Sequence, residues 1–291
     1  METNGSGKII NSRAQSIVLL LITGFLWSLG GVFIKTTDAH PLVISCIRSF
    51  SAAICLFVYL RGKPRFVFTR VQFAGALCYA GTVTVFITAT KLTTSANAIL
   101  LQYSSPVFVA ILGWLILKEA LYWYDYLSMG GVAAGLVFLL SGSIGFDSIA
   151  GSVLAILSGL FYASLMILLK LHKDGSRVET LLLGNLFAAL VGLPFLFINP
   201  APISALPPVI FLGVFQIAIP YILFAKASER APALDLALLP IVEPLLNPVW
   251  VFLVTGEQPA ALTYIGGIIL LGVITFRSLI VLRTGEASQK T

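Results

Sequence analysis

The sequence predicts an all-α membrane protein in which ten transmembrane helices form two inverted five-helix repeats. Three observations lead to this prediction. Only 10% of the 291 residues are charged, whereas a soluble domain carries about 25%. The chain contains repeated apolar runs of eighteen or more residues, the length that crosses the hydrocarbon core of a bilayer. Its second half also repeats landmarks of its first half. Composition therefore excludes a soluble enzyme, a disordered chain and a nucleic-acid-binding protein.

The ten expected spans are joined by short loops. They cover residues 16–35, 41–60, 71–90, 96–117, 123–141, 149–170, 178–198, 208–226, 233–254 and 260–281. The first five spans form a first repeat at 16–141, and the last five form a second at 149–281. Residues 1–15 and 282–291 are expected to be cytoplasmic tails.

Lysine and arginine are distributed unevenly between the two sides of the predicted membrane. Fifteen of the 18 fall on the side of the N-terminus, and two, Lys35 and Lys91, fall on the other side. Because short cytoplasmic loops are enriched in basic residues, both termini are expected in the cytoplasm. The net charge of +6 is then a topology signal. The remaining arginine, Arg48, lies within the second span, where it either snorkels outward or takes part in a salt bridge or a cavity.

An internal repeat relates the two halves. Thr23, Gly24, Trp27 and Lys35 match Ser158, Gly159, Tyr162 and Lys170 at an offset of 135, and Ala89, Pro106 and Glu119 match Ala227, Pro244 and Glu257 at an offset of 138. Since each half has an odd number of spans, the second half must enter the membrane from the opposite side. Inverted repeats are typical of secondary transporters, in which substrates bind near the midplane at broken helices.

The fourth and ninth spans are the predicted broken helices. The fourth carries Gln102-Tyr103-Ser104-Ser105-Pro106, and the ninth carries Pro240, Pro244 and Pro248. Proline removes a helical hydrogen bond and exposes carbonyl groups that need a polar environment. The predicted helix breaks are Pro106, Pro220, Pro244 and Pro248. The residues expected to line a central aromatic cavity are Trp27, Tyr79, Thr82, Phe86, Gln102, Tyr103, Ser105, Tyr162, Tyr221, Glu243 and Asn247.

Most of these side chains have an alternative role in packing. Aromatic residues in membrane helices commonly pack against neighbours or anchor at the interface, and prolines can be simple kinks. Glu243 is different, because an ionisable group near the centre of the bilayer is a functional candidate by default. Its counterpart in the first half is Ser105, so only one half brings a carboxyl group to the midplane.

These features resemble the drug/metabolite transporter superfamily, EamA type. The resemblance rests on two five-helix halves with short loops, proline-bearing fourth and ninth helices, and the matching stretches from Pro106 to Lys118-Glu119 and from Pro244 to Gly256-Glu257. Within the superfamily, Trp27, Tyr79, Tyr103 and Tyr162 make the chain most similar to YddG-type bacterial exporters of aromatic amino acids. That similarity implies a location in the bacterial inner membrane and efflux of amino acids.

The expected function is therefore export of aromatic or large neutral amino acids by alternating access. The alternative is a multidrug or organic-cation exporter of the same superfamily, because an aromatic cavity with one carboxylate also suits a cation. Glu243 either carries a coupling proton or binds the substrate or the broken helix. No enzyme activity, cofactor or metal is expected: His40 and His172 lie in loops on opposite sides, and no phosphate-binding loop is present. The expected partners are the amino acid and membrane lipid.

Overall fold

The computed structural model describes residues 4–141, 146–172, 177–231 and 233–284. In these residues the chain is helical and contains no strand. The α-helices are α1 (Asn4–Ser28), α2 (Gly30–Thr36), α3 (Pro41–Tyr59), α4 (Arg70–Leu92), α5 (Ser95–Gln102), α6 (Ser105–Leu112), α7 (Trp123–Ser141), α8 (Phe146–Leu171), α9 (Arg177–Ile198), α10 (Leu206–Phe211), α11 (Ile219–Ser228), α12 (Ala233–Leu238), α13 (Val242–Thr255) and α14 (Ala261–Thr284).

Short non-α turns connect several of these helices into longer spans. π-Helical turns at Gly113–Leu117 and Leu212–Ala218 continue α6 and α10, and a 3-10 turn at Leu239–Ile241 joins α12 to α13. A further 3-10 turn, Ile203–Ala205, precedes α10. The predicted fourth, eighth and ninth spans are therefore each assembled from several helical pieces.

The predicted number of ten spans is only partly confirmed. Among the described residues, eight stretches are long and apolar enough to cross a membrane, and Ala261–Arg277 is a shorter apolar helix. The fifth predicted span, 123–141, is helix α7, which is not one of the eight.

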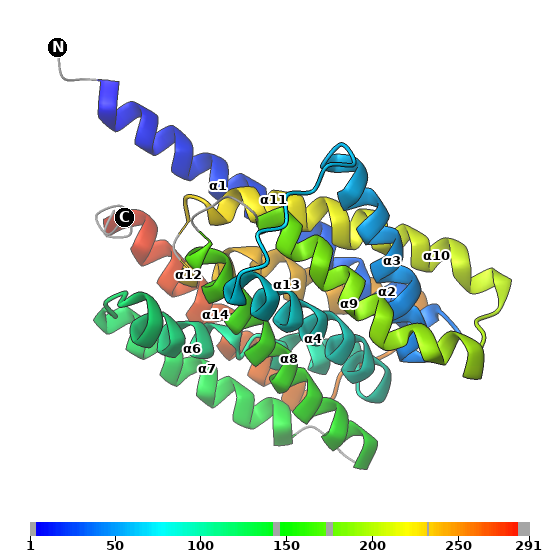
Figure 1. The fold of residues 1–291 in the computed structure, drawn as a ribbon. Helices are drawn as coiled ribbons and strands as arrows, with labels where there is room; N and C mark the ends of the chain where they lie inside the picture. The colour runs from blue at the N-terminus through cyan, green and yellow to red at the C-terminus, as the bar shows by residue number, and fades with distance from the viewer. Residues whose placement is uncertain (1–3, 142–145, 173–176, 232, 285–291) are drawn as a thin grey trace.

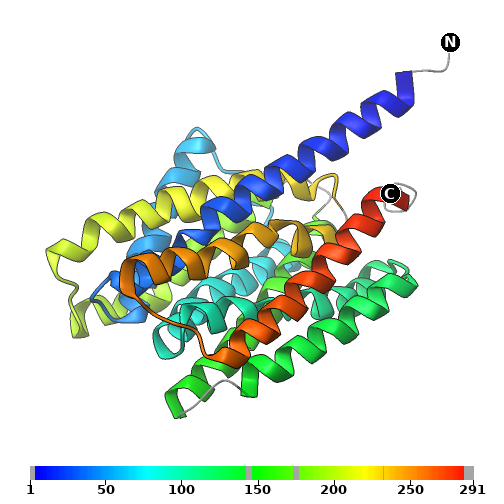
Figure 2. The same cartoon turned by 180° about the vertical axis from the view of Figure 1, so that it is seen from behind.

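Most of the predicted N-terminal tail is helical. Helix α1 begins at Asn4 and runs without a break to Ser28, and the stretch that is apolar enough to cross a membrane begins at Gln15. No proline interrupts this segment. Residues 1–3 of this tail and 285–291 of the C-terminal tail lie outside the described residues. The beginning of α1 and the end of α14 lie at the same end of the bundle (Figures 1 and 2).

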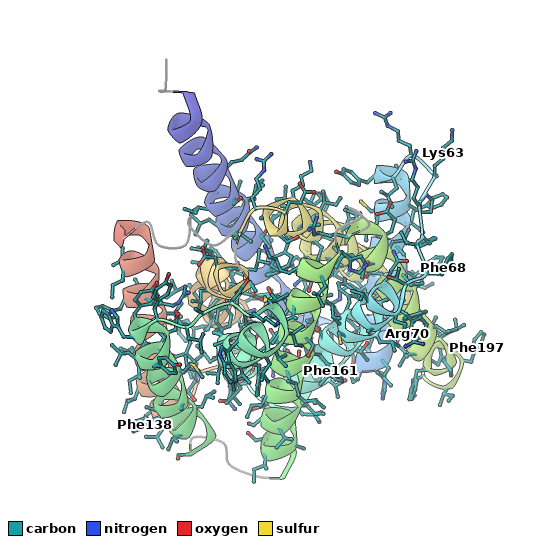
Figure 3. All side chains as sticks on the ribbon, turned by 60° about the vertical axis from the view of Figure 1, so that its left-hand side comes forward. Lys63, Phe68, Arg70, Phe138, Phe161 and Phe197 are labelled. Carbon is teal, nitrogen blue, oxygen red and sulfur yellow. The ribbon has the colours of Figure 1, made fainter. Side chains whose placement is uncertain are left out.

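Apolar side chains cover much of the outside of the bundle. Phe197 is 82% exposed and Val58 is 68% exposed, and Phe138 and Phe197 point away from the helices in Figure 3. A soluble monomer rarely exposes apolar surface this extensively. The surface is instead that of a multi-pass protein whose helices face lipid, as the composition indicates.

The two halves pack in equivalent ways. Helix α1 packs against α11 and α13, and its counterpart α8 packs against α4 and the pair α5 and α6. The remaining helices pair across the halves, α3 with α9 and α7 with α14, and Figure 2 shows α14 running beside α7. This arrangement places α1, α4, α8 and α11 in the interior, around the broken spans.

Individual contacts repeat at the offsets found in the sequence. The Thr23 hydroxyl donates to the Pro220 carbonyl at 3.3 Å, and the Ser158 hydroxyl donates to the Thr82 carbonyl at 2.9 Å. The amino group of Lys35 likewise donates to the Thr93 carbonyl, and that of Lys170 donates to the Ala231 carbonyl. In each pair the donors are 135 residues apart and the acceptors 138. The two halves therefore share equivalent hydrogen bonds at the positions that the sequence repeat relates.

Two glycines bring the interior helices close to the broken spans. A Cβ atom placed on Gly24 would lie 2.7 Å from the Pro240 carbonyl oxygen, and one placed on Gly159 would lie 2.7 Å from the Gln102 carbonyl oxygen. Both neighbours are backbone atoms, so neither can move aside cheaply. Only glycine permits these two approaches.

We expect Gly24→Val and Gly159→Val each to destabilise the protein by about 1–3 kcal/mol, because overpacking forces the backbone to shift. Gly130→Val is the matched control, since nothing lies within 4 Å of a Cβ at that helical position. Thermal unfolding of the purified proteins in detergent measures the difference. Equal melting temperatures for Gly24→Val and Gly130→Val would contradict the close approach.

Candidate functional site

The fourth span breaks just before its proline. Helix α5 ends at Gln102 and α6 begins at Ser105, with Pro106 in its first turn. Proline lacks the N–H that would bond to the carbonyl four residues earlier, which here belongs to Gln102. The backbone therefore changes direction at the carbonyl that has lost its helical donor.

The ninth span breaks at the equivalent place. Pro240 has a non-helical ψ of 23° within the 3-10 turn, and Pro244, four residues later, cannot supply a helical donor to its carbonyl. Pro240 and Gln102 are 138 residues apart, so the two breaks are related by the internal repeat. Pro106 and Pro244 thus lie one turn beyond the positions at which their helices bend.

The other two prolines predicted to break helices lie inside longer spans, and at Pro248 the predicted break is absent. Pro220 lies in the first turn of α11, immediately after the π-helical turn Leu212–Ala218. Pro248 lies within α13, which continues through it to Thr255. Between α1 and α2 a single residue, Leu29, interrupts the helix; its backbone keeps near-helical values (φ −71°, ψ −18°), so the first span continues as one stretch.

A hydrogen bond joins the two broken spans. The Tyr103 hydroxyl donates to the Pro240 carbonyl at 2.8 Å, and Tyr103 is the first residue after α5. The phenol therefore supplies a donor to a carbonyl whose α-helical donor was removed by Pro244. In a membrane interior such carbonyls must be satisfied from within the protein, so this contact couples one break to the other.

A cavity lies where the two breaks meet the interior helices. The space measures about 470 Å³, including the part that is open to solvent. It is lined by Trp27, Arg48, Thr82, Val83, Phe86, Gln102, Tyr103, Ser105, Tyr162, Gln216, Ile217, Tyr221 and Glu243. These residues come from both halves of the chain.

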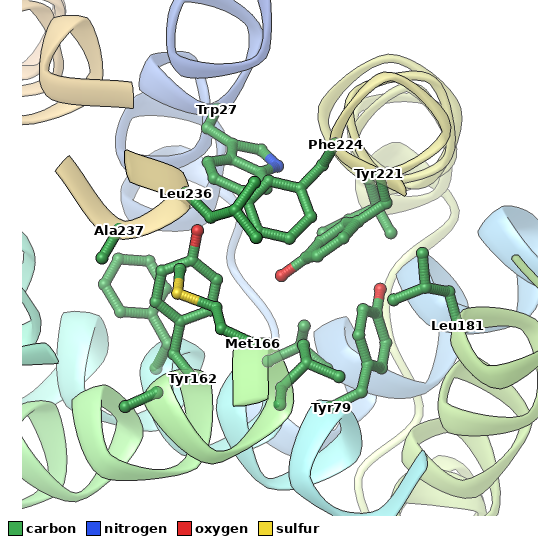
Figure 4. Close-up of a cluster of buried hydrophobic side chains, with 14 of the residues drawn as sticks. Trp27, Tyr79, Tyr162, Met166, Leu181, Tyr221, Phe224, Leu236 and Ala237 are labelled. Carbon is green, nitrogen blue, oxygen red and sulfur yellow. The ribbon is translucent and has the colours of Figure 1, made fainter. Parts of the chain in front are cut away.

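Aromatic rings form one wall of this cavity. The Trp27 ring lies 5.9 Å from that of Tyr162, 5.0 Å from that of Tyr221 and 5.6 Å from that of Phe224, measured between centroids. Figure 4 shows these rings facing one another from three different helices. The Trp27 indole N–H and the Tyr162 hydroxyl are buried and have no hydrogen-bond partner among the described residues. The described residues therefore leave both polar atoms unsatisfied.

Nine of the eleven predicted site residues line the cavity, and two lie elsewhere. Tyr79 packs edge-on against Tyr221 and donates its hydroxyl hydrogen to Asn185 Oδ1 at 3.1 Å, behind the wall. Asn247 Oδ1 accepts from the Ser95 hydroxyl at 2.7 Å and joins α13 to α5. Each of these two side chains makes a specific contact between helices.

The cavity also contains residues that the sequence analysis did not assign to it. Val83, Gln216 and Ile217 were missed, and the role of Arg48 was left open. Arg48 is only 1% exposed, which excludes the alternative that it snorkels outward. Gln216 could have been found from the sequence, because it is a lone amide in an apolar run.

One buried carboxyl group faces the cavity without a protein partner. Glu243, which is 8% exposed, takes part in no hydrogen bond or ion pair within the described part of the chain. An ionisable group in this position is costly unless it is neutral or paired. A bound cationic group or a proton would remove that cost.

Ion pairs tie the broken spans to their neighbours at both ends. Lys35, near the end of α2, forms a 2.8 Å ion pair with Glu257, which also accepts from the Ser95 N–H at the start of α5. Near the start of the ninth span, Arg277 of α14 bonds to Asp125 at 2.8 Å and to Asp235 at 3.3 Å. Changes in the tilt of the broken spans would have to rearrange these pairs.

Comparison with known proteins identifies the family. The model of the EamA-like transporter family matches residues 14–141 and, a second time, residues 149–278. The chain belongs to the EamA-like transporter family. Because the same family model matches once in each half, the chain contains two copies of one repeat.

Curated relatives are similar along half or more of the chain. An uncharacterized transporter of Archaeoglobus fulgidus is 27% identical over 282 residues, covering 89% of this chain and 95% of its own. Solute carrier family 35 member G1 of Homo sapiens is 26% identical over 55% of this chain and 48% of its own. The uncharacterized transporter YdfC of Bacillus subtilis is 28% identical over 64% of this chain and 63% of its own.

A solved crystal structure has the same fold. It matches with a TM-score of 0.69 and 18% identity, covering 92% of this chain and 98% of that one. At this identity the similarity concerns the fold alone. The family match, in turn, establishes a membrane transporter built from two repeats.

We expect Tyr103→Phe to destabilise the protein by about 1–2 kcal/mol, because the Pro240 carbonyl loses a buried donor. Tyr126→Phe is the control, since Tyr126 is 61% exposed and the same hydroxyl is removed there. Unfolding in a graded series of denaturing detergent measures both. A Tyr103→Phe protein as stable as the control would mean that the bond between the two breaks contributes nothing.

Proposed function

We propose that this protein is a secondary transporter that exports neutral, zwitterionic amino acids with aromatic or large apolar side chains, as YddG-type exporters do. The observation that carries the proposal is the unpaired Glu243 carboxyl group in an aromatic cavity between two symmetry-related helix breaks. Substrate sites in transporters built from inverted repeats occur at such breaks. The membership of the EamA family supports transport as the activity.

The chemistry of the cavity suits an amino acid in two respects. The rings of Trp27, Tyr162 and Tyr221 would bury an aromatic side chain, and ring pairs contribute about 0.5–1.5 kcal/mol beyond the burial of area. Glu243 would bind the ammonium group.

Alternating access follows from the internal repeat. Each half would contribute five spans, at 16–141 and 149–281, with the second half inverted. The breaks at Gln102 and Pro240 would let the outer and inner parts of the fourth and ninth spans tilt separately. The cavity would then open first on one side of the membrane and then on the other, as the two halves exchange roles.

The proposed orientation places both termini in the cytoplasm of a bacterial cell, with the chain in the inner membrane. It is supported by the fifteen basic residues on the side of the N-terminus against two on the other. Lys35 and its partner Glu257 would then lie on the outer side, and Arg277 with its two carboxylates on the cytoplasmic side.

The same observation favours a second candidate, a multidrug or organic-cation exporter. A lone carboxylate among aromatic rings attracts a quaternary or aromatic ammonium ion by charge and by cation–π contact. The two candidates differ in whether the substrate must also carry a carboxylate. They can therefore be separated by transport measurements on a small set of compounds.

In proteoliposomes we expect the protein to carry labelled phenylalanine and not ethidium. Tyr162→Ala should lower the rate at subsaturating phenylalanine by about tenfold, because a buried ring contact of this kind contributes roughly 1–1.5 kcal/mol. Tyr126→Ala removes an exposed ring as the control. Transport of ethidium but not phenylalanine would establish the organic-cation exporter in place of the amino-acid exporter.

We expect phenylalanine to move down its own gradient without proton coupling. Proton relays usually continue through further ionisable groups, and the outer part of the ninth span offers only Asn247 and Trp250. Flux is measured in proteoliposomes with and without an imposed pH gradient, for the wild type and for Glu243→Gln. Uphill accumulation that is driven by the gradient and lost in Glu243→Gln would show that Glu243 carries a coupling proton.

A further inference from the structure

Arg48 is a buried cation without an anionic partner. It lies on α3, lines the central cavity and is 1% exposed. Its guanidinium donates to Gln216 Oε1 at 3.1 Å and to the Val83 carbonyl at 3.4 Å. Both acceptors are neutral. Within the described residues, no carboxylate lies within ion-pairing distance of Arg48.

Another buried arginine shows how this chain compensates such a charge elsewhere. Arg277, which is 6% exposed, bonds to two carboxylates, those of Asp125 and Asp235. Arginine stays protonated in proteins, and a buried charge without a counter-ion is expensive. The guanidinium of Arg48 therefore lacks the anionic partner that would offset the cost of burying its charge.

Part of that guanidinium is free to meet a ligand. An arginine has five N–H donors in one plane, and the Arg48 Nε–H has no hydrogen-bond partner among the described residues. A carboxylate binds such a group through two parallel hydrogen bonds. Arg48 therefore lines the cavity and has one buried N–H donor that no described residue satisfies.

Gln216 fixes the direction of this guanidinium. Its Nε2 donates to the Trp27 carbonyl at 3.4 Å, and a Cβ on Gly30 would lie 2.8 Å from the same nitrogen. The amide is held from behind by the first span, and this leaves Oε1 facing Arg48. Gln216 is a positioning residue, because it acts on a ligand through Arg48.

We propose that Arg48 binds the carboxylate of the transported molecule, so that a free carboxylate is a requirement for transport. This inference rests on the proposed function. Arg48 belongs to the first half and Glu243 to the second, and the two line one cavity without forming an ion pair with each other. A zwitterion placed between them would satisfy both charges at once, whereas an organic cation would leave Arg48 unpaired.

The decisive experiment compares molecules that differ by one group. Phenylalanine, phenylalaninamide and 3-phenylpropionate are tested as competitors of labelled phenylalanine uptake into proteoliposomes. For the wild type we expect phenylalaninamide to compete about 10- to 100-fold more weakly than phenylalanine, as the loss of charge-assisted hydrogen bonds predicts. 3-Phenylpropionate, which keeps the carboxylate, should compete measurably.

Variants assign the effect to Arg48. Arg48→Gln should lower phenylalanine uptake about tenfold or more and bring phenylalanine and phenylalaninamide to within about threefold of each other. Gln216→Leu should shift the same ratio in the same direction by a smaller factor. Arg61→Gln, in the exposed turn after α3, is the matched control and should leave both uptake and the ratio unchanged.

The outcomes separate this inference from the proposed function. Suppose that the wild type carries phenylalanine and that phenylalaninamide competes for its uptake as well as unlabelled phenylalanine does. Arg48 then does not bind the carboxylate, and the inference alone is overturned. The wild-type comparison decides this even if Arg48→Gln fails to fold. If phenylalanine is not carried at all, the proposed function fails and takes the inference with it, since no carboxylate substrate then remains.

Discussion

The structure depends on how backbone carbonyls are satisfied at two breaks inside a membrane. Pro106 and Pro244 remove the helical donors of the Gln102 and Pro240 carbonyls, and hydrocarbon offers no replacement. The protein meets this constraint with close packing and with side chains. Gly159 and Gly24 bring α8 and α1 against these carbonyls, and Tyr103 donates to that of Pro240. The central helices must therefore lie where they do, and the polar cavity is a consequence of the breaks.

The sequence was sufficient to predict the helical membrane class, the duplication and most of the cavity. These properties follow from local patterns: apolar runs, matched prolines, and polar or aromatic residues at corresponding positions such as Trp27 and Tyr162. Other features depend on tertiary contacts, which periodicity does not contain. Asn247 lies one turn after Glu243 on the same helix face, but its side chain accepts a hydrogen bond from Ser95 outside the cavity lining. Tyr79 likewise donates its hydroxyl hydrogen to Asn185 and does not line the cavity. The breaks predicted at Pro106 and Pro244 lie one turn earlier in the structure, at Gln102 and Pro240, because a proline removes the donor of the carbonyl four residues before it.

Arg48 illustrates a further limit of reasoning from sequence. A lone arginine in an apolar span can snorkel, pair with a carboxylate or face a cavity, and these alternatives look identical along the chain. The choice depends on Gln216, which is 168 residues away in sequence. Gln216 in turn depends on the close approach of Gly30 in the first span. The orientation of one guanidinium therefore requires three spans to be packed before it is defined.

The internal repeat shows how a symmetric scaffold acquires an asymmetric site. Arg48 and Gln216 correspond at an offset of 137 to Asn185 and Tyr79, and that second pair also forms a hydrogen bond, between Tyr79 Oη and Asn185 Oδ1. The same contact between equivalent helices is thus charged in one copy and neutral in the other. Glu243 and Ser105 differ in the same way. Each charge occurs in one half only, so two related halves enclose a cavity with one cationic and one acidic group.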